Sequence, residues 1–272
     1  MPSQFRMGAC TMSRHVDRCL GMSLTINAIL LSAASAGPLL IGGAHEYNPV
    51  ADIGYTPQSG LIVNNSGVAF GSERLYLPSS SGVRGLRFGP ASGTAVELGH
   101  LGLNPNGEPY SDIATVNSNG TAAGTSWKYV NGIAKGDRPV VWLPGETAIT
   151  ELQTLGTDSN GYTRAWVLDM NESGALAGCS YKYINNVEIG QRAVRWNSIA
   201  AVPIELGILP ESGTPTHSTR ASEINSSGQI FGTVARGDDN RPVRWDPSSI
   251  NPIPLGLLGL NAEGETRHCL KT

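Results

Sequence analysis

A short motif that returns at a near-constant interval constrains the fold of this chain more than any other feature. In each copy an Asn is followed two residues later by Ser or Asn and three residues later by Gly. The four copies are Asn64–Gly67, Asn117–Gly120, Asn171–Gly174 and Asn225–Gly228, so the first Asn advances by 53, 54 and 54 residues. A period of this length is typical of repeat proteins, in which each unit buries its faces against its neighbours.

Three further anchors recur in phase with the motif. Four residues after each motif Gly comes a second Gly, at Gly71, Gly124, Gly178 and Gly232. An aromatic residue then ends a β-prone run, at Phe88, Trp142, Trp196 and Trp245. A Leu follows, at Leu98, Leu152, Leu206 and Leu255. The aromatic and the Leu both advance by 54, 54 and 49 residues, which indicates a short deletion in the last unit.

Each unit is predicted to hold four short strands. In the third unit these are Arg164–Met170, Ala175–Tyr183, Gln191–Trp196 and Ile204–Leu206. Asn and Gly tolerate positive φ, which tight hairpin turns require, so the turn residues between these runs favour antiparallel hairpins. The chain contains 34 Gly and 17 Pro among 272 residues, and no sustained helical periodicity appears in the repeat region.

Four antiparallel strands in a unit of about 50 residues, repeated radially, are typical of a β-propeller. We therefore expect an all-β fold: a β-propeller of about four four-stranded blades, or an incomplete propeller, preceded by an N-terminal apolar segment. The repeat region spans residues 60–272, with units near 60–111, 112–163, 164–219 and 220–262. A stacked β-array and a β-sandwich are the alternatives.

The repeated residues are expected to have structural roles. The second Gly of each unit is expected where strands crowd near the central channel, because a side chain would clash there. The Trp and Leu are expected to fill the space between neighbouring blades, since one sheet cannot bury its faces alone.

The third strands of units two to four share a pattern of Arg, Pro or Ala, Val, any residue and Trp. They are Arg138–Trp142, Arg192–Trp196 and Arg241–Trp245. Together with the Asn motif, the second Gly and a Leu-Gly-rich fourth strand, this resembles the HAF-type extracellular repeats of bacterial proteins over residues 50–262. Unit one departs from the pattern with Gly85–Phe88. The resemblance implies a propeller-like fold and a secreted or surface location, and it implies no catalytic residue.

The N-terminus has the composition of an export signal. Arg14 and Arg18 precede an apolar run from Cys19 to Ala36, which ends in Ala34-Ser35-Ala36. Residues 1–36 are therefore predicted to be a signal peptide, with an uncleaved N-terminal anchor as the alternative. Residues 37–59 are a lead-in or a partial blade. The expected location is secreted or cell surface.

Composition argues against a nucleic-acid partner. The net charge is −3, the pI is about 6.0, and no basic cluster with interleaved aromatic residues occurs. A membrane partner is expected only through an uncleaved N-terminal segment. We expect a non-catalytic binding or structural module for a surface glycan or protein of unknown identity. Its variable loops are predicted at Ser79–Arg84, Lys128–Asp137, Tyr183–Gln191 and Gly237–Asn240.

The alternative is an extracellular hydrolase or lyase that acts on polysaccharides. Such an enzyme needs several acids at one end of the channel, and Glu97, Glu151 and Glu205 recur in phase. Equivalent positions do not provide distinct acid and base environments, so no catalytic residue is predicted.

No cofactor-binding or metal residue is predicted. Asp158–Gly161 and Asp238–Asn240 loosely resemble oxygen-rich calcium loops, but turn chemistry explains both. Cys179 is expected to be a buried apolar residue, with a bond to Cys269 as the alternative.

Overall fold

The computed structural model describes residues 54–57, 61–77, 80–89, 95–209, 218–236 and 239–256. Every regular element in these ranges is a β-strand, which confirms the all-β prediction. No helix among them is long and apolar enough to cross a membrane. The predicted signal peptide or anchor, most of the lead-in, and Cys269 lie outside the described residues.

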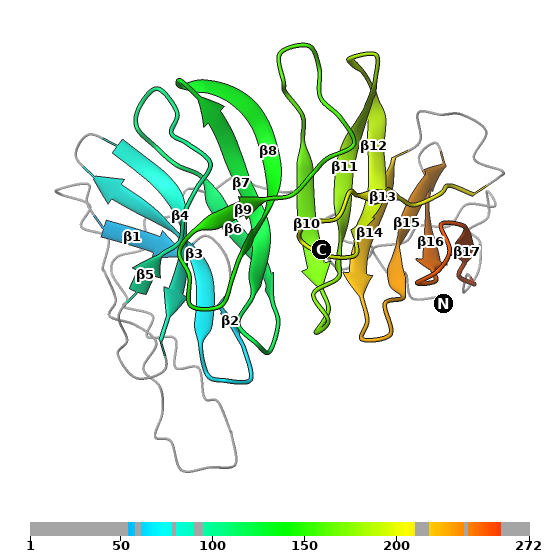
Figure 1. Ribbon diagram of the computed structural model, residues 1–272, viewed down its shortest axis with the longest axis horizontal. Coiled ribbons are helices and arrows are strands. Elements are labelled where there is room, and N and C mark those ends of the chain that lie inside the picture. Colours follow the sequence, from blue (N-terminus) through cyan, green and yellow to red (C-terminus); the bar gives the residue numbers. More distant parts are fainter. Residues whose placement is uncertain are drawn as a thin grey trace, which may run out of the picture. The chain divides into compact units, whose positions relative to one another are not determined.

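The strands form four antiparallel sheets, each a meander in chain order (Figure 1). The first sheet contains β1 (Gly54–Pro57), β2 (Ile62–Val63), β3 (Ala69–Leu77), β4 (Ser80–Phe88) and β5 (Ala95–Glu97). The second contains β6 (Ser111–Val116), β7 (Ala122–Val130), β8 (Ile133–Trp142) and β9 (Ile149–Glu151). The third contains β10 (Ala165–Met170), β11 (Leu176–Ile184), β12 (Val187–Trp196) and β13 (Ile204–Glu205). The fourth contains β14 (Thr219–Ile224), β15 (Ile230–Arg236), β16 (Asp239–Trp245) and β17 (Pro252–Pro254).

The first sheet differs from the predicted four strands because its edge is divided in two. β2 pairs with Ala69 and Phe70 at the start of β3, whereas β1 pairs with the segment from Glu73 to Tyr76. The two short strands therefore lie end to end along the same edge of β3. β1 comes from the segment predicted as a lead-in, so that segment contributes a fifth strand.

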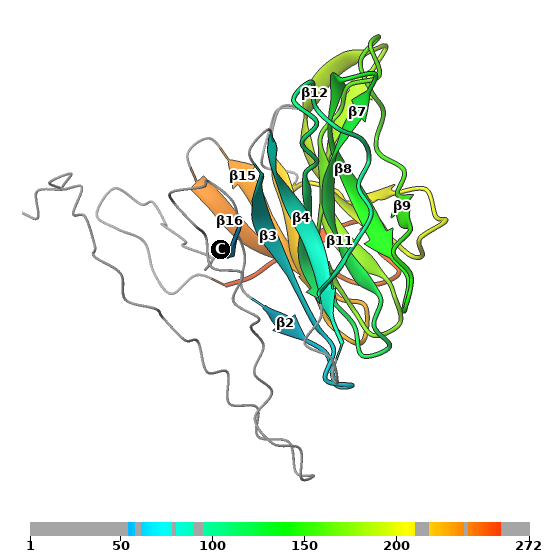
Figure 2. The ribbon, with the colours of Figure 1, turned by 90° about the vertical axis from the view of Figure 1, so that its left-hand side faces the viewer.

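Each sheet packs against the next one in the chain. β6 packs on β3 and β4, β10 packs on β7 and β8, and β14 packs on β11 and β12. Figure 2, seen from the side of the first sheet, shows β3 and β4 in front of strands of the second and third sheets. Among the described strands, no packing of similar extent joins the first sheet to the fourth. The described residues thus form a consecutive series of sheets.

Three hydrophobic cores lie between the four sheets, and each contains one fully buried Trp. Trp142 lies in the core between the first and second sheets, Trp196 between the second and third, and Trp245 between the third and fourth. Phe88, the equivalent aromatic of the first unit, is partly buried. Burial of such a ring contributes more to stability than any exposed ion pair in the chain.

The three indole N–H groups satisfy their hydrogen bonds in an equivalent way. Trp142 donates to the carbonyl of Gly99 at 3.1 Å, Trp196 to that of Gln153 at 2.9 Å, and Trp245 to that of Gly207 at 3.1 Å. Each acceptor lies just after the last strand of the preceding sheet. The Trp therefore fills the space between two sheets and also joins them through a buried polar contact.

The second Gly of units two to four is required by a bulge in the strand beside it. The first strand of each sheet shifts register at Ile113/Thr115, Val167/Asp169 and Ala221/Glu223. A Cβ on Gly178 would lie 2.0 Å from the carbonyl oxygen of Trp166, and Gly124 is crowded equally by Asp112. The crowding expected near a central channel is therefore crowding by a neighbouring strand of the same sheet. The bulge pushes a carbonyl over the Gly.

The Asn motif forms a closed turn between β2 and β3 in the first sheet and between the first two strands in each of the other three sheets. In the third sheet, Asn171 Oδ1 accepts hydrogen bonds from the backbone N–H of Ser173 at 3.1 Å and of Ala175 at 3.0 Å. Gly174 has a φ of 83°, which favours Gly. The same side-chain bond to the residue four positions on is made by Asn64, Asn117 and Asn225.

Candidate binding surface

Two long hairpins extend from one end of the second and third sheets. β7 and β8 are joined by Asn131 and Gly132, with φ of 52° and 76°, and β11 and β12 by Asn185 and Asn186, with φ of 51° and 65°. Two-residue turns with both φ positive match the twist of antiparallel strands. The predicted loops Lys128–Asp137 and Tyr183–Gln191 are therefore wrong: they are mostly strand, with tight turns at their tips. The predicted loop Ser79–Arg84 is wrong as well, since Ser80–Arg84 belong to β4.

A connecting segment lies between the two hairpins and contacts both. The backbone N–H of Thr163 donates to the carbonyl of Lys135 in the first hairpin at 3.1 Å. The backbone N–H of Tyr183 in the second hairpin donates to the carbonyl of Leu155 at 3.2 Å. The ammonium group of Lys135 also donates to the carbonyl of Asn160 at 2.8 Å. The two hairpins and segment 155–163 therefore form one continuous surface, which we call the hairpin end.

The tips of the hairpin end expose aliphatic side chains. Ile133 is 62% exposed and Val187 is 63% exposed. Val130 and Ile184, on the other side of each turn, are also exposed. Scattered exposed apolar residues are ordinary, but equivalent pairs at the tips of two neighbouring hairpins form a shared feature of this end.

Below the tips lies a series of aromatic and arginine side chains, here called the aromatic row. Trp127, which is 44% exposed, stacks on Tyr110 with ring centroids 5.0 Å apart. In the third sheet the guanidinium of Arg164 lies 5.0 Å from the ring centroid of Trp166 and 5.5 Å from that of Tyr181. Both arrangements are favourable, because an aromatic face attracts a cation and an offset ring.

One ion pair connects the two halves of the aromatic row. Asp137 lies directly across the hairpin from Trp127, and its Oδ2 is 3.0 Å from the Nε of Arg164. This contact raises the pKa of Arg164, chiefly through the hydrogen bond from its side chain to Asp137. Arg164 therefore stays charged while it spans the two sheets.

Two tyrosines at or beside the hairpin end, Tyr110 and Tyr183, have raised pKa values. Burial, reinforced by the charges of Asp112 and Asp137, raises the pKa of Tyr110. Burial also raises the pKa of Tyr183 to about 12, with the nearby carboxylate of Glu188 as the next cause. Both phenols therefore remain neutral hydrogen-bond donors. Asp112 adds an acceptor, since its buried Oδ1 has no hydrogen-bond partner among the described residues.

The recurring glutamates each pair with a basic side chain of their own sheet. Glu97 pairs with Arg84 at 2.8 Å. Glu151 lies 2.7 Å from Lys128, and Glu205 lies 2.6 Å from Lys182, in each case with an Arg of the third strand also in range. These carboxylates hold fourth strands to their sheets, and the contacts do not bring the three together as catalytic acids.

The segment that resembled a calcium loop is a turn of the Asn type. Asp158 Oδ1 accepts hydrogen bonds from the backbone N–H of Asn160 at 2.8 Å and of Tyr162 at 2.7 Å. Asn104 makes the equivalent bonds in the preceding connection. In the described ranges no group of three or more His, Cys, Asp or Glu could hold a metal ion. Asp238 of the second candidate loop lies outside those ranges.

Cys179 is a free, buried thiol on β11. Burial raises the pKa of Cys179 from 9.0 to about 12. The thiol is thus held in its neutral, unreactive form in the folded chain, because the thiolate is the nucleophile. Its predicted alternative partner, Cys269, lies outside the described residues.

We expect Cys179 to resist a thiol reagent at pH 8 in the native protein and to react within minutes after denaturation. Above pH 9.0 only the unfolded state loses this proton, so the stability due to the neutral thiol should fall from there to about pH 12. Replacing Cys179 with Ser should remove the labelling that appears only after denaturation. Rapid labelling of Cys179 in the native state would contradict its burial.

One signal in the sequence, present in two copies, could have revealed the hairpin end. Each hairpin reads Tyr, then Val or Ile, then two turn residues, then Ile or Val, at Tyr129–Ile133 and Tyr183–Val187. This pattern predicts a two-residue turn between apolar ends. The aromatic row gives no such signal, because Tyr110 and Trp166 become neighbours of Trp127 and Tyr181 only through strand register.

Known proteins resemble this chain in structure at low sequence identity. No family model and no curated protein matches it, so the likeness to HAF-type repeats stays a prediction. A prolyl endopeptidase structure has 11% identity and a TM-score of 0.48 over 72% of this chain and 29% of its own. The structure of the polysaccharide lyase Uly1 has 11% identity and a TM-score of 0.41, over 78% of this chain and 52% of the lyase chain. The β-propeller domain of the Trilobed protease from Pyrococcus furiosus has 8% identity and a TM-score of 0.31, over 74% of this chain and 85% of the protease domain. The chain thus spans about a third and about half of the first two proteins.

Proposed function

We propose that this chain is a non-catalytic binding module of a secreted or surface protein, and that its hairpin end binds a protein partner. The observation that carries the proposal is the exposure of equivalent aliphatic pairs, Val130 with Ile133 and Ile184 with Val187, at two neighbouring hairpin tips. Such side chains gain stability from burial against another apolar surface, by about 1.5–3 kcal/mol for each one fully buried.

The scaffold suited to this role is a β-propeller, complete or incomplete. Each sheet is a meander that packs on the next one in the chain, which is how propeller blades follow one another. Rigid blades present hairpins and connections at their ends, where chemistry can vary without change to the core.

A protein partner fits the hairpin end better than a glycan does. Trp, Tyr and Arg are the side chains that most often dominate protein interfaces, and the aromatic row consists of these types. A glycan could stack on Trp127, but the four aliphatic side chains at the tips offer it no hydrogen bonds. An apolar protein surface would cover both the tips and the row.

The non-catalytic part of the proposal rests on the recurring acids. Glu97, Glu151 and Glu205 have basic partners within their own sheets, so their recurrence is explained by strand packing. The location rests on the basic flank and apolar run of residues 1–36 in the sequence.

Site-specific photo-crosslinking in the producing cells tests the proposed partner. A benzophenone side chain at position 133 or 187 should give one crosslinked product of the same size from both positions. The same group at Ser198, an exposed position at the opposite end of the third sheet, is the matched control and should give none. Ile133→Ser combined with Val187→Ser should abolish the product formed from position 130.

Two results would overturn the protein-partner proposal. One is equal crosslinking from position 198 and from the tips. The other is binding to a glycan array that is lost in Trp127→Ala and unchanged in the double Ser variant. Release of reducing sugar from such a glycan, abolished by replacing one acid, would instead favour an enzyme.

A further inference from the structure

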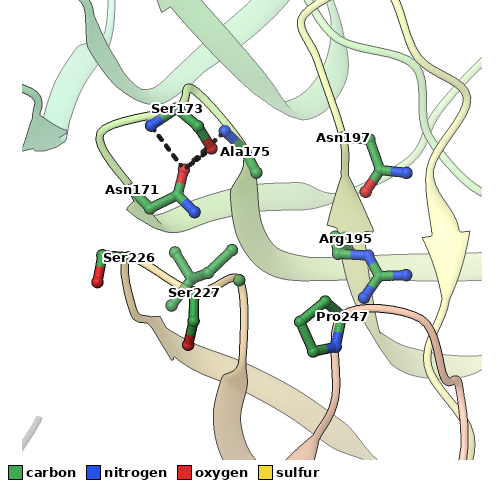
Figure 3. A pocket seen from close by; sticks show the side chains of 10 residues that line it. Asn171, Ser173, Ala175, Arg195, Asn197, Ser226, Ser227 and Pro247 are labelled. Atoms are coloured by element: carbon green, nitrogen blue, oxygen red, sulfur yellow. Dashed lines mark hydrogen bonds between the residues drawn. The ribbon is translucent and has the colours of Figure 1, made fainter.

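A second polar site lies at the opposite end of the third and fourth sheets, away from the hairpin end. A pocket of about 170 Å³ opens between the Asn-motif turn of the third sheet and that of the fourth. Figure 3 shows the two turns on one side, with Ser173 and Ser226, and Arg195 and Asn197 on the other. The pocket is of a size that accepts a small ion with some of its water.

Arg195 is the unusual side chain of this pocket. It is only 6% exposed, and it lies on β12 with its guanidinium beside Pro247 (Figure 3). Its Nη1 donates to the carbonyl of Asp246 at a long 3.3 Å. Its buried Nε has no hydrogen-bond partner among the described residues. A buried charged donor without a partner is costly, so this arrangement favours a ligand that supplies one.

The carboxylates described around the pocket are engaged elsewhere. Asp246 Oδ1 is 3.0 Å from the Nε of Arg244. Asp169 Oδ2 accepts the backbone N–H of Ile224 at 2.8 Å, and Glu172 accepts the backbone N–H of Ser118 at 2.9 Å. Consistent with this, burial lowers the pKa of Arg195 with no compensating contribution from an acid. Among the described residues, the guanidinium therefore has no counter-ion of its own.

The first sheet contains an arginine at the equivalent position, Arg87, and its guanidinium makes two short hydrogen bonds. Arg87 stands one residue before the aromatic anchor, as Arg195 does. It donates from Nη1 to the carbonyl of Glu146 and from Nη2 to that of Gly145, each at 3.0 Å. These carbonyls belong to the loop after the third strand of the next sheet. Arg195 reaches the corresponding loop of the fourth sheet through a single long bond, and the pocket lies beside it.

We propose that this pocket is a binding site for a small oxyanion, such as sulfate, phosphate or a carboxylate group, held by the guanidinium of Arg195. Hydrogen bonds from a guanidinium to such an anion are charge-assisted and stronger than neutral ones. The amide of Asn197 lines the same pocket on the side of Arg195 and is a further donor (Figure 3). The site is independent of the proposed protein-binding surface, because the two lie at opposite ends of β11.

Thermal unfolding of the full chain in sodium sulfate and in sodium chloride at equal ionic strength tests the site. At ten times its Kd, sulfate should raise the Tm by about 3–5 °C more than chloride does. Arg195→Gln should weaken sulfate binding by about tenfold or more. Arg87→Gln is the matched control, since both Nη atoms of Arg87 already donate to backbone carbonyls, and it should keep the full sulfate response. Acetate and phosphate titrations then separate a carboxylate site from a phosphate or sulfate site.

A second variant keeps the test informative if Arg195→Gln fails to fold. Asn197 is exposed and lines the pocket on the same side as Arg195 (Figure 3). Asn197→Asp keeps the size of this side chain, so it should supply an internal counter-ion to Arg195 and abolish the sulfate response while it leaves the fold intact. An equal response to sulfate and chloride in the wild-type chain would overturn the proposal. So would an unchanged sulfate response in both Arg195→Gln and Asn197→Asp.

Discussion

Replacing Trp196 with Ala is expected to lower the free energy of unfolding by about 3–5 kcal/mol. The ring is fully buried between the second and third sheets, and its indole N–H donates to the carbonyl of Gln153 at 2.9 Å. The substitution removes the apolar contact, leaves a cavity, and removes the donor to the Gln153 carbonyl. Trp142→Ala and Trp245→Ala should cost a similar amount, because they occupy equivalent places. Urea unfolding followed by circular dichroism measures the change.

The matched control for the buried rings is Trp127→Ala in the aromatic row. Trp127 is 44% exposed, so its removal should cost clearly less than that of any of the three buried rings. A loss below about 0.5 kcal/mol for Trp196→Ala would show that the ring is not a packing element between sheets.

Replacing Gly178 with Ala is expected to destabilise the chain by about 3 kcal/mol or more, well beyond a usual surface substitution. The added Cβ would lie 2.0 Å from the carbonyl oxygen of Trp166 and 3.2 Å from the ring of Trp196. A backbone carbonyl in a bulged strand cannot move away as a flexible side chain does. The same effect is expected for Gly124→Ala and Gly232→Ala.

Gly256→Ala is the matched control, because a Cβ there would meet no heavy atom within 4 Å. Its effect should stay within about 0.5 kcal/mol. Chemical denaturation of the two variants side by side provides the comparison. Equal stability of Gly178→Ala and the wild-type chain would mean that the first strand of the third sheet is not bulged toward Gly178.

The recurrence of Trp142, Trp196 and Trp245 was sufficient to predict the buried rings between sheets. Each interface between sheets needs a large side chain at the same place, so a Trp that recurs with the repeat indicates a buried ring at each interface. Gly124 and Gly178 were recognisable as sites of crowding for the same reason. The carbonyl that crowds each Gly could not be predicted. The bulges lie at Ala114 and Leu168, and these residue types also occur in regular strands.

The length of the hairpins could not be read from residue type alone. Segment 128–137 is rich in Lys, Gly and Asn, and it was predicted as a loop. In the structure β7 and β8 continue through it to a two-residue turn. Beyond the packed part of a sheet both faces meet solvent, so the alternation that marks a half-buried strand disappears.

The candidate binding surface depends on register and on residues that do not recur. Tyr110 has Arg164 as its counterpart in the next unit, and Asp112 has Trp166. A comparison of the repeats detects only residues that recur, so it misses these positions, although they determine the chemistry of the hairpin end. The pocket beside Arg195 was missed for a different reason: an Arg also stands at this place in the first and fourth units, at Arg87 and Arg244, so residue type alone does not mark it.

Hydrogen exchange of the five tryptophan indole N–H groups, followed by NMR on the ¹⁵N-labelled chain, tests the repeated-sheet account most directly. The account predicts that Trp142, Trp196 and Trp245 exchange only through cooperative unfolding, because each donates to a carbonyl of the preceding connection inside a buried core. Trp127 should exchange fastest, because its ring is exposed. Exchange of any of the three buried indoles at the rate of Trp127 would contradict the claim that one ring per repeat joins each sheet to the next.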